Sequence, residues 1–187
     1  MCIRDSGIPV HAKNARRIKG IVGYLPQEVG FYPGMTVYEF LYYMSMLQEV
    51  PARTAKERIE TLLTQVNLTE ERNKLVKNLS GVMRRRLGLA QAMINDPPIL
   101  IVDEPTAGLD PEERVRLRNM LSYFSKDRTV ILSTHIVEDI AACANDICVL
   151  DKGHVIFHGG IEEILEPIRG KIHSVEFGSD MERETLG

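Results

Sequence analysis

The sequence predicts an α/β fold, in which a parallel sheet forms the core and a helical subdomain is inserted between its strands. The first observation is the apolar run at residues 99–102, which ends abruptly in the carboxylates Asp103 and Glu104. A short apolar run bounded by turn formers suits a strand buried on both faces of a parallel sheet. Carboxylates at the carboxyl end of such a strand lie where open α/β sheets bind ligands. The second observation is a change to helical periodicity across residues 29–77.

Further apolar runs supply the other predicted strands. Residues 21–25 are predicted to form a short strand that ends at Pro26 and Gln27, and residues 129–133 a buried strand that His135 follows. Residues 147–150 and 155–157 flank a turn at residues 151–153, which is typical of a hairpin.

The inserted segment contains two predicted helices. The apolar residues of the first fall at helical spacing on one face: Val37, Phe40, Leu41, Met44 and Leu47. Thr54 followed by Glu57 matches a capping box and predicts the start of the second helix. The residues predicted to point inward from that helix are Ile59, Leu62, Leu63 and Val66.

Two further helix starts carry polar side chains. Ser80 and Gly81 directly precede a basic, regularly apolar segment, and a serine at a helix start offers a hydroxyl and free N–H groups to an anion. Asp110, Pro111 and Glu113 predict another start, with Asp at the N-cap and Pro at the first helical position. That helix is expected to run to about residue 125, with shorter helices at residues 136–144 and 162–165. The arginines at residues 84–86 are interpreted as a solvated helix face.

Composition limits the possible functions. The chain has 187 residues, enough for one domain with a proper core. Its 23 basic and 26 acidic residues show no clustered basic surface, so no nucleic-acid partner is expected. No apolar stretch approaches the roughly 18 residues of a membrane span, and no secretory signal is visible. Three cysteines are too few for a disulfide framework or a zinc site, and Cys143 and Cys148 are expected in the core, in a reducing cytoplasm.

Five short motifs together resemble those of one protein family. LSGVM at residues 79–83 is similar to the signature of the ABC family, and ILIVDEP at residues 99–105 resembles its Walker B strand with the following catalytic Glu. AGLD at residues 107–110 resembles the D-loop, while Gln27 and His135 stand where the Q-loop glutamine and switch histidine belong. Five motifs in the right order over about 110 residues are not expected by chance. The chain is identified as a P-loop NTPase-like ATP-binding domain of an ABC transporter, matching from about residue 18 to residue 165.

The resemblance implies a role for each of these residues, with ATP and Mg²⁺ as cofactors. Glu104 resembles the general base, Asp103 the residue that holds Mg²⁺ through water, and His135 the group that contacts the γ-phosphate. Gln27 resembles the residue that contacts Mg²⁺ and water, and Asp110 that of the D-loop. Ser80 and Gly81 resemble signature residues that reach ATP on a partner subunit. Val82, the next residue, stands where most family members have glycine.

One family motif is absent from the sequence. The phosphate loop, G-x-x-x-x-G-K-[S/T], does not occur, although it supplies a backbone cradle, a lysine for the β- and γ-phosphates and a Ser or Thr for Mg²⁺. We therefore expect an N-terminally truncated fragment with an incomplete sheet core and no catalytic activity of its own. Residues 1–6 do not fit the family pattern of the later residues and are interpreted as a junction.

The resemblance also sets expectations for organisation and partners. Residues 7–170 are the partial ATPase domain, with the helical subdomain at about residues 28–80, and residues 171–187 begin an accessory segment. The expected partners are a transmembrane permease and a second ATP-binding subunit in a head-to-tail dimer, at the inner face of the cell membrane. The LSG-x-MRRRLG and STHIVED forms most resemble the exporter-like ABC-2 branch. Two alternatives are open: a non-transport ABC ATPase of the translation-factor or DNA-repair type, and a non-catalytic remnant.

One group of aromatic residues in the inserted segment has two interpretations. The group comprises Phe31, Tyr32, Tyr42 and Tyr43. These rings either form part of the surface that docks on the permease or pack within the helical subdomain.

Overall fold

The computed structural model describes residues 4–5, 8–9 and 14–166. The accessory segment expected at residues 171–187 and most of the junction expected at residues 1–6 lie outside these residues. The short strands β1 (Arg4–Asp5) and β2 (Ile8–Pro9) pair antiparallel. The chain divides into two compact units, Met1–Cys143 and Ala144–Gly187, each of which is described by itself.

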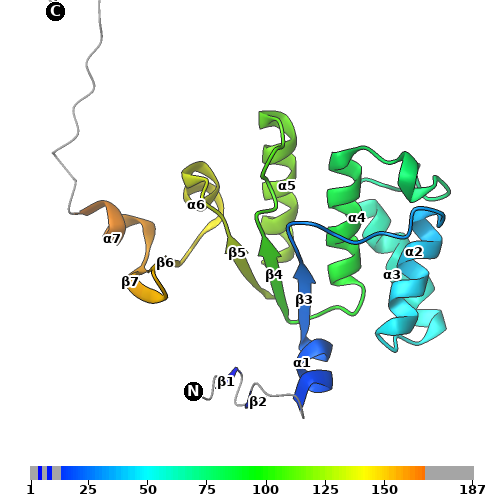
Figure 1. The fold of residues 1–187 in the computed structure, drawn as a ribbon, viewed down its shortest axis with the longest axis horizontal. Helices are drawn as coiled ribbons and strands as arrows, with labels where there is room; N and C mark the ends of the chain where they lie inside the picture. The colour runs from blue at the N-terminus through cyan, green and yellow to red at the C-terminus, as the bar shows by residue number, and fades with distance from the viewer. Residues whose placement is uncertain (1–3, 6–7, 10–13, 167–187) are drawn as a thin grey trace, which may run out of the picture. The chain divides into compact units, whose positions relative to one another are not determined.

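A parallel sheet forms the centre of the first unit. Its strands are β3 (Val22–Leu25), β4 (Ile99–Asp103) and β5 (Thr129–Ser133), in the order β3-β4-β5. Both strand pairs are parallel, and the arrowheads of β3 and β4 point the same way in Figure 1. The predicted α/β fold and its sheet strands are confirmed.

The sheet is covered on one face only within this part of the structure. Leu100 and Val102 are fully buried on the covered face. The register places Tyr24, Ile101 and Ile131 side by side on the opposite face, where Tyr24 and Ile131 are each 51% exposed. The prediction that β4 and β5 are buried on both faces is therefore wrong for the described residues, because their helices pack against a single face.

The strand β3 is preceded by a helix that the sequence did not predict. This helix, α1 (Ala15–Ile21), includes Ile21, which was predicted to begin the strand. Asn14 occupies its N-cap position but makes no capping hydrogen bond through its side chain, and no acidic residue stands in the first turn. Asn is a residue type favoured at the N-cap, but without an acidic first turn this single signal did not predict the helix.

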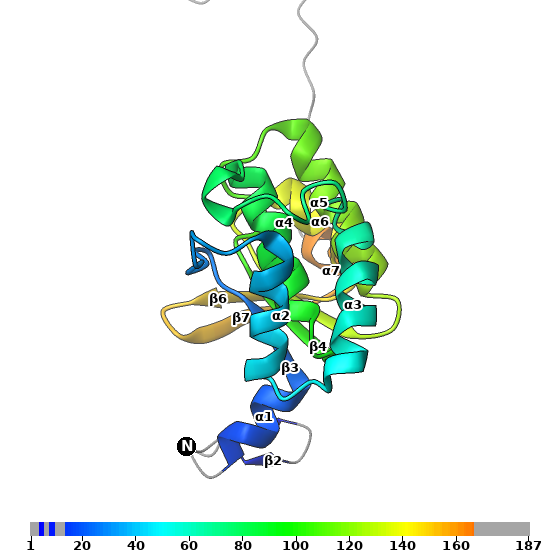
Figure 2. The ribbon, with the colours of Figure 1, turned by 90° about the vertical axis from the view of Figure 1, so that its right-hand side faces the viewer.

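Three helices form a layer against the sheet. They are α2 (Val37–Leu47), α3 (Ala52–Gln65) and α4 (Gly81–Met93), and a short 3₁₀ helix at Val76–Asn78 precedes α4. Helix α4 packs on β3 and also contacts α2 and α3, so it lies between the sheet and the other two helices (Figures 1 and 2).

The helix starts in this layer differ in part from the prediction. Thr36 caps α2 in a capping box with Glu39, whose carboxylate accepts from the Thr36 backbone N–H at 2.8 Å. These hydrogen bonds lower the pKa of Glu39. The capping box predicted at Thr54 and Glu57 is wrong, because α3 already begins at Ala52, directly after Pro51.

The core confirms most of the predicted inward faces. In α3, Ile59 and Leu63 are fully buried and Leu62 nearly so, and Val66 at the C-cap is also fully buried. In α2, Val37, Phe40 and Leu41 are fully buried, Met44 is half-buried and Leu47 is 59% exposed. Leu47 is the last residue of its helix, so the core does not extend far enough to cover it.

Two more helices complete the first unit. Helix α5 (Pro111–Phe124) buries Leu117, Leu121 and Phe124 in the same core cluster as the sheet. Helix α6 (Val137–Cys143) follows β5 and contacts α5. Cys143 is partly buried, and this burial raises the pKa of its thiol.

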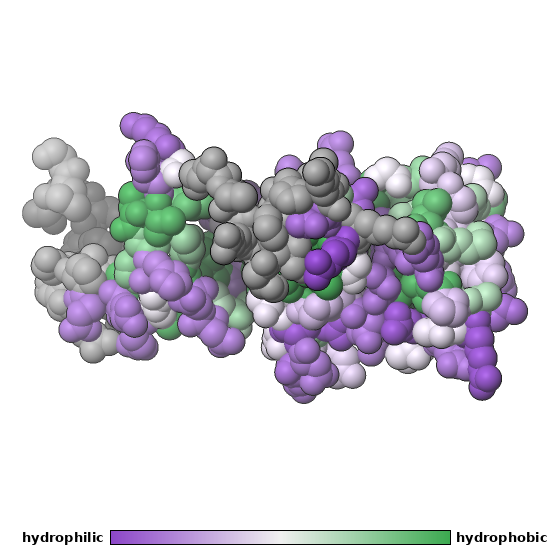
Figure 3. Space-filling model, turned by 90° about the horizontal axis from the view of Figure 1, so that it is seen from below, coloured by the Kyte–Doolittle hydropathy of each residue, from purple (hydrophilic) through white to green (hydrophobic). Residues whose placement is uncertain are grey.

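The second unit contains the predicted hairpin. Its strands, β6 (Ile147–Asp151) and β7 (His154–Gly159), are antiparallel, and α7 (Ile161–Leu165) follows them. Lys152 and Gly153 form the turn with φ of 47° and 81°. Cys148 is exposed, so its predicted place in the core is wrong. Apolar side chains of the hairpin lie at the surface (Figure 3), namely Leu150, Val155 and Ile156.

Among residues 4–5, 8–9 and 14–166, every helix is too short or too polar to cross a lipid bilayer.

Candidate functional site

The carboxyl ends of the three parallel strands bring the predicted site residues to one edge of the sheet. Leu25 pairs with Val102, and Asp103 pairs with Ser133. Gln27, Glu104 and His135 each follow one of these strands within two residues. Gln27 is exposed in the loop after β3. The parallel register thus gathers residues that are far apart in the sequence, as expected for a ligand site of an α/β sheet.

Asp103 is the last residue of β4 and lies on the uncovered face of the sheet. The hydroxyl of Ser133, its neighbour in the register, donates a hydrogen bond to Asp103 Oδ1. Ser133 had no predicted role in the site, because only the strand pairing brings it beside Asp103. This contact orients the carboxylate and leaves its other oxygen for a second partner.

Glu104 and His135 form a close pair. His135 Nδ1 lies 2.8 Å from Glu104 Oε1, and the Glu104 side chain is 20% exposed against 76% for His135. The second carboxylate oxygen, Glu104 Oε2, is buried without a hydrogen-bond partner. A buried carboxylate oxygen without a partner is costly and indicates a binding position for a donor, an ion or a water molecule.

The backbone of Glu104 has an unusual conformation. Its φ of 45° lies in the left-handed region, which residues other than glycine seldom adopt. Its N–H donates to Ser133 O at 3.0 Å, and its carbonyl accepts from Ala107 N at 3.3 Å. Strained backbone of this kind persists where the surroundings hold it, and it occurs most often at functional sites.

The remaining predicted site residues lie at helix starts. Ser80 caps α4, where its hydroxyl accepts from Met83 N at 3.2 Å, and Gly81 has open space around it. Asp110 caps α5, where its carboxylate accepts from Glu113 N at 2.9 Å. The hydrogen bonds described for these caps lie within their own helix starts, so the structure does not join them to the pair of Glu104 and His135.

Comparison with known proteins identifies the family. A family model described as ABC transporter matches residues 3–107, and a model of an AAA domain matches residues 77–138. The chain belongs to the ABC transporter family.

Relatives and solved structures agree with this assignment. The chain is 32% identical to the uncharacterized ABC transporter ATP-binding protein YxlF of Bacillus subtilis, over 87% of this chain and 55% of that protein. It is 38% identical to the Nod factor export ATP-binding protein I of Ralstonia nicotianae, over 84% of this chain and 49% of that protein. A solved ATP-binding subunit of an ABC transporter has the same fold, with a TM-score of 0.76 at 23% identity over 90% of this chain and 70% of the other. The chain spans about half the length of the curated relatives it matches.

Membership of the ABC transporter family makes ATP the ligand against which the site is tested. Asp103, Glu104 and Gln27 present oxygen atoms, which Mg²⁺ prefers, and Glu104 Oε2 lacks a partner. Within the described part of the chain, no group of three or more His, Cys, Asp or Glu side chains could hold a metal ion. Mg²⁺ in protein sites is commonly bound by one or two carboxylates together with substrate phosphates and water. The residues present therefore fit Mg²⁺ that is held jointly with a nucleotide.

The three consecutive arginines of α4, at residues 84–86, are not a solvated face. Arg84 is exposed, but Arg85 and Arg86 are partly buried. Arg86 pairs with Glu113 of α5, with side chains only 13% and 16% exposed. The interpretation of residues 84–86 is therefore wrong at two positions, because α4 turns Arg86 toward α5 and Arg85 toward the loops after β3 and β4.

Prediction from sequence also missed a buried polar pair beside residues 107–110, formed by Thr106 and Asp139. Thr106 donates a hydrogen bond to Asp139 Oδ2, and both residues are at most 1% exposed. Arg118 Nη1 lies 3.4 Å from Asp139 Oδ1. Neither Thr106 nor Asp139 stands in a pattern that predicts the contact, although a charged residue on the buried side of a short helix is a signal to look for a partner.

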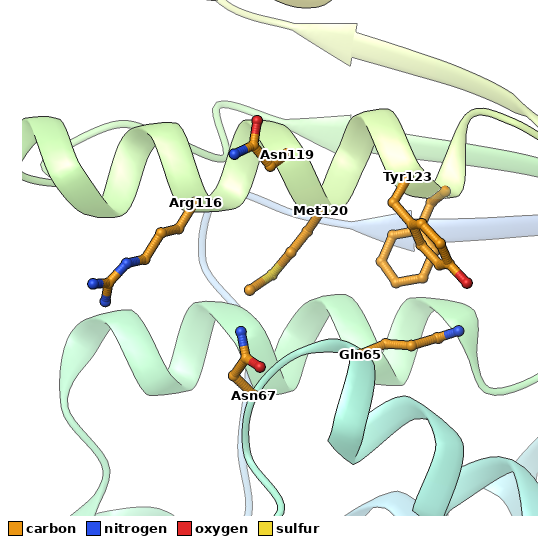
Figure 4. Close-up of a pocket in the computed structure, with 7 residues that line it drawn as sticks. Gln65, Asn67, Arg116, Asn119, Met120 and Tyr123 are labelled. Atoms are coloured by element: carbon orange, nitrogen blue, oxygen red, sulfur yellow. The ribbon is translucent and has the colours of Figure 1, made fainter.

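A cavity of about 390 Å³ lies between the end of α3 and one face of α5, and no predicted site residue lines it (Figure 4). Its lining comprises Gln65, Asn67, Arg116, Asn119, Met120, Tyr123 and Phe124. The carboxylates that nucleotide chemistry requires are at the strand ends instead, so the cavity is not part of this site.

Proposed function

We propose that the chain is part of an ATP-binding subunit that couples ATP binding and hydrolysis to transport across a membrane. The observation that carries the proposal is the gathering of Gln27, Asp103, Glu104 and His135 at one sheet edge, with His135 Nδ1 2.8 Å from Glu104. Nucleotide hydrolysis needs a base for water, a contact to the leaving phosphate and oxygen ligands for Mg²⁺, and these residue types supply all three.

Glu104 acts as the general base in this proposal. Its carboxylate is held by a fixed backbone and by His135, and its second oxygen remains available to accept a proton from water. A general base must lie within hydrogen-bond reach of the proton that it removes, so the proposal requires a water molecule beside Glu104 Oε2, which lacks a hydrogen-bond partner within the protein.

His135 contacts the γ-phosphate in this proposal. A carboxylate only accepts hydrogen bonds, so the contact with Glu104 requires a proton on Nδ1. The ring is 76% exposed, which leaves Nε2 accessible to a ligand.

Asp103 and Gln27 bind the ion that accompanies ATP. Asp103 would hold Mg²⁺ through water while Ser133 orients its carboxylate, and the exposed Gln27 would approach the ion and the attacking water. When bound with the nucleotide, Mg²⁺ neutralises charge on the phosphate oxygens.

Ser80, Gly81 and Asp110 serve a second ATP-binding subunit in a head-to-tail dimer. Ser80 and Gly81 present the amino end of a 13-residue helix, and such an end attracts phosphate through its free N–H groups and its dipole. Asp110 fixes the start of α5 and hence the D-loop before it. The open space around Gly81 supports close approach of a partner's ligand.

By itself, this chain does not hydrolyse ATP. The sequence lacks G-x-x-x-x-G-K-[S/T], so the backbone cradle and the lysine that phosphoryl transfer requires are not supplied. We propose that the residues at the sheet edge complete a site whose phosphate loop comes from additional sequence.

The transport class and its partner are supported by the relatives. Relatives named Nod factor export ATP-binding protein I include those of Ralstonia nicotianae and Rhizobium etli, which supports the exporter-like ABC-2 branch. The partner would be a transmembrane permease, with this chain at the inner face of the membrane. A solved structure similar in fold, at 21% identity, is cbiO1, part of the ABC transporter complex cbiONQ.

The aromatic group of the helical layer supports a docking surface in part. Phe31 packs edge-on against the buried Phe40, with ring centroids 5.3 Å apart, and Tyr42 stacks on Tyr38. Tyr32 is 48% exposed and lies edge-on to Tyr43, and the hydrogen bond between their hydroxyls raises the pKa of Tyr43. We propose that Tyr32 faces the permease while the other rings position it.

The ATPase proposal is tested on the chain extended at its N-terminus by a phosphate-loop segment from a relative. Mg²⁺-dependent ATP hydrolysis is expected, and it should disappear when the phosphate-loop lysine is replaced. An extended, folded chain that binds Mg²⁺-ATP but never hydrolyses it would contradict the catalytic assignment.

The partner proposal is tested by co-purification in detergent with a multi-span membrane protein encoded beside this chain. Tyr32→Ala should weaken co-purification, whereas Tyr123→Ala, at an equally exposed tyrosine of α5, should not. Equal recovery of both variants would remove Tyr32 from the interface, and the absence of any such membrane protein would favour a non-transport ABC ATPase.

A further inference from the structure

Arg85 connects the loops that carry two of the proposed site residues. It lies on α4, and its Nη1 donates a hydrogen bond to the backbone oxygen of Gln27. Its Nη2 donates to the backbone oxygen of Glu104 at 3.1 Å. One guanidinium group thus links the helix that begins within the signature motif to the Q-loop and to the end of the Walker B segment.

The chemistry of arginine suits this position. Its planar group presents several N–H donors in a fixed fork, so that one side chain can hold two carbonyl oxygens at once. Arg85 is partly buried, and this burial lowers its pKa, while the charge of Asp103 acts in the opposite direction. A lysine would keep the charge but offers no such fork, so the two contacts depend on the guanidinium itself.

One of the two carbonyl groups that Arg85 holds belongs to Glu104, whose backbone conformation is the rarest among the proposed site residues. Glu104 has a φ of 45°, and its carbonyl accepts from both Arg85 and Ala107. Such a conformation persists only where neighbouring contacts hold it. Arg85 is therefore one of the contacts that define where the Glu104 carboxylate lies.

Helix α4 is pressed against the strand and loop on either side of Gln27. A Cβ atom added at Gly88 would lie 2.8 Å from Leu25 Cδ1 and 2.9 Å from Val29 Cγ2. Gly88 stands one helical turn after Arg85, on the buried side of the helix. A displacement of α4 therefore moves the Arg85 anchor together with this packed surface.

We propose that Arg85 is a positioning residue. It holds the backbone of Gln27 and Glu104 at fixed positions relative to α4, so that a movement of α4 displaces both residues. The proposal rests on the proposed ATPase function, since Gln27 and Glu104 act only in that reaction. The contacts themselves involve no nucleotide, so they can be measured separately.

The first experiment uses the chain as it stands. Amide hydrogen exchange is compared for Arg85→Gln and Arg85→Lys, with Arg53→Gln and Arg53→Lys as matched controls, since the Arg53 side chain is 93% exposed on α3. In Arg85→Gln, the amide of Ala107 should exchange on the order of tenfold faster, because its acceptor carbonyl is released. Arg85→Lys should restore little of this protection, and α2 and α3 should be unchanged. No change at Ala107, or a uniform increase throughout the chain, would overturn the proposal.

The second experiment measures kcat and KM in the chain extended by a phosphate-loop segment. Arg85→Gln should lower kcat by about tenfold to a hundredfold, since small displacements of catalytic groups have effects of this size. KM for ATP should stay within about threefold, because Arg85 touches loops rather than nucleotide, and Arg53→Gln should change neither constant. A normal kcat, or a raised KM alone, would overturn the positioning role. If even the unmodified extended chain is inactive, the proposed function fails, while the exchange experiment still decides whether Arg85 holds the loop of Glu104.

Discussion

His135 Nδ1 lies 2.8 Å from Glu104 Oε1, although 31 positions separate the two residues in the sequence. The contact exists because β4 and β5 are parallel neighbours that end at the same edge, with Asp103 opposite Ser133. Glu104 is mostly buried and His135 mostly exposed, so the pair connects the interior of the sheet edge to its surface. This arrangement allows one residue to be held rigidly while the other meets a ligand.

The chain as it stands should release no phosphate from Mg²⁺-ATP above background. The reason is the missing phosphate loop, on which the electrostatic stabilisation of phosphoryl transfer depends. A coupled phosphate-release assay measures this, with the chain extended by a phosphate-loop segment as positive control. Turnover by the chain alone that Glu104→Gln abolishes would contradict the interpretation as a fragment.

In the extended chain, Glu104→Gln should bind nucleotide normally but hydrolyse it slowly. The amide keeps the shape of the side chain and removes the base, and general bases contribute about 10²–10⁴-fold to such reactions. Size-exclusion chromatography with Mg²⁺-ATP should then show an accumulated dimer. Turnover at the unmodified rate would exclude Glu104 as the base.

His135→Ala should reduce turnover far more than stability. The side chain is 76% exposed, so its loss should change the free energy of unfolding by no more than about 0.5 kcal/mol. Loss of a contact to the γ-phosphate should lower kcat of the extended chain by about 10²-fold. Thermal denaturation and steady-state kinetics on the same sample check both values, and comparable losses in the two would indicate a structural histidine.

Asp139→Asn should destabilise the chain without any nucleotide present. Asp139 is fully buried, accepts from Thr106 and pairs with Arg118, so the change leaves a partly buried guanidinium without its charged partner. Removing one partner from a buried polar contact costs about 1–3 kcal/mol. Urea denaturation measures the difference against Glu138→Gln, an equal loss of charge at the exposed neighbouring position. Equal midpoints for the two variants would show that the buried pair contributes little.

Val82→Gly should increase ATP-driven dimerisation of the extended chain. Val82 is the second residue of α4, two positions after Ser80, where a β-branched side chain adds bulk beside the proposed phosphate position. Glycine costs about 0.5–1 kcal/mol within a helix, whereas one recovered hydrogen bond to phosphate contributes about 1.5–3 kcal/mol. Sedimentation with and without Mg²⁺-ATP measures the effect. A variant that melts earlier and dimerises no better would show that valine is compatible with the signature contact.

The sequence alone predicted the sheet strands, the closing hairpin and the two capped helix starts. These predictions depend on local signals, namely apolar runs and the N-cap residues Ser80 and Asp110. A local signal predicts the structure correctly where no tertiary contact favours a different one. The helix at Ala15–Ile21 and the start of α3 after Pro51 were missed because their local signals are absent or misleading.

The motifs Gln27, Asp103–Glu104 and His135 could be named from the sequence, since each follows an apolar run in a recognisable order. What only the tertiary structure decided is how these residues are held. The contacts of Ser133 with Asp103, of Arg85 with the carbonyls of Gln27 and Glu104, and of Thr106 with Asp139 all join distant segments. Strand register and helix packing create such contacts, and neither is written in the pattern of any single segment.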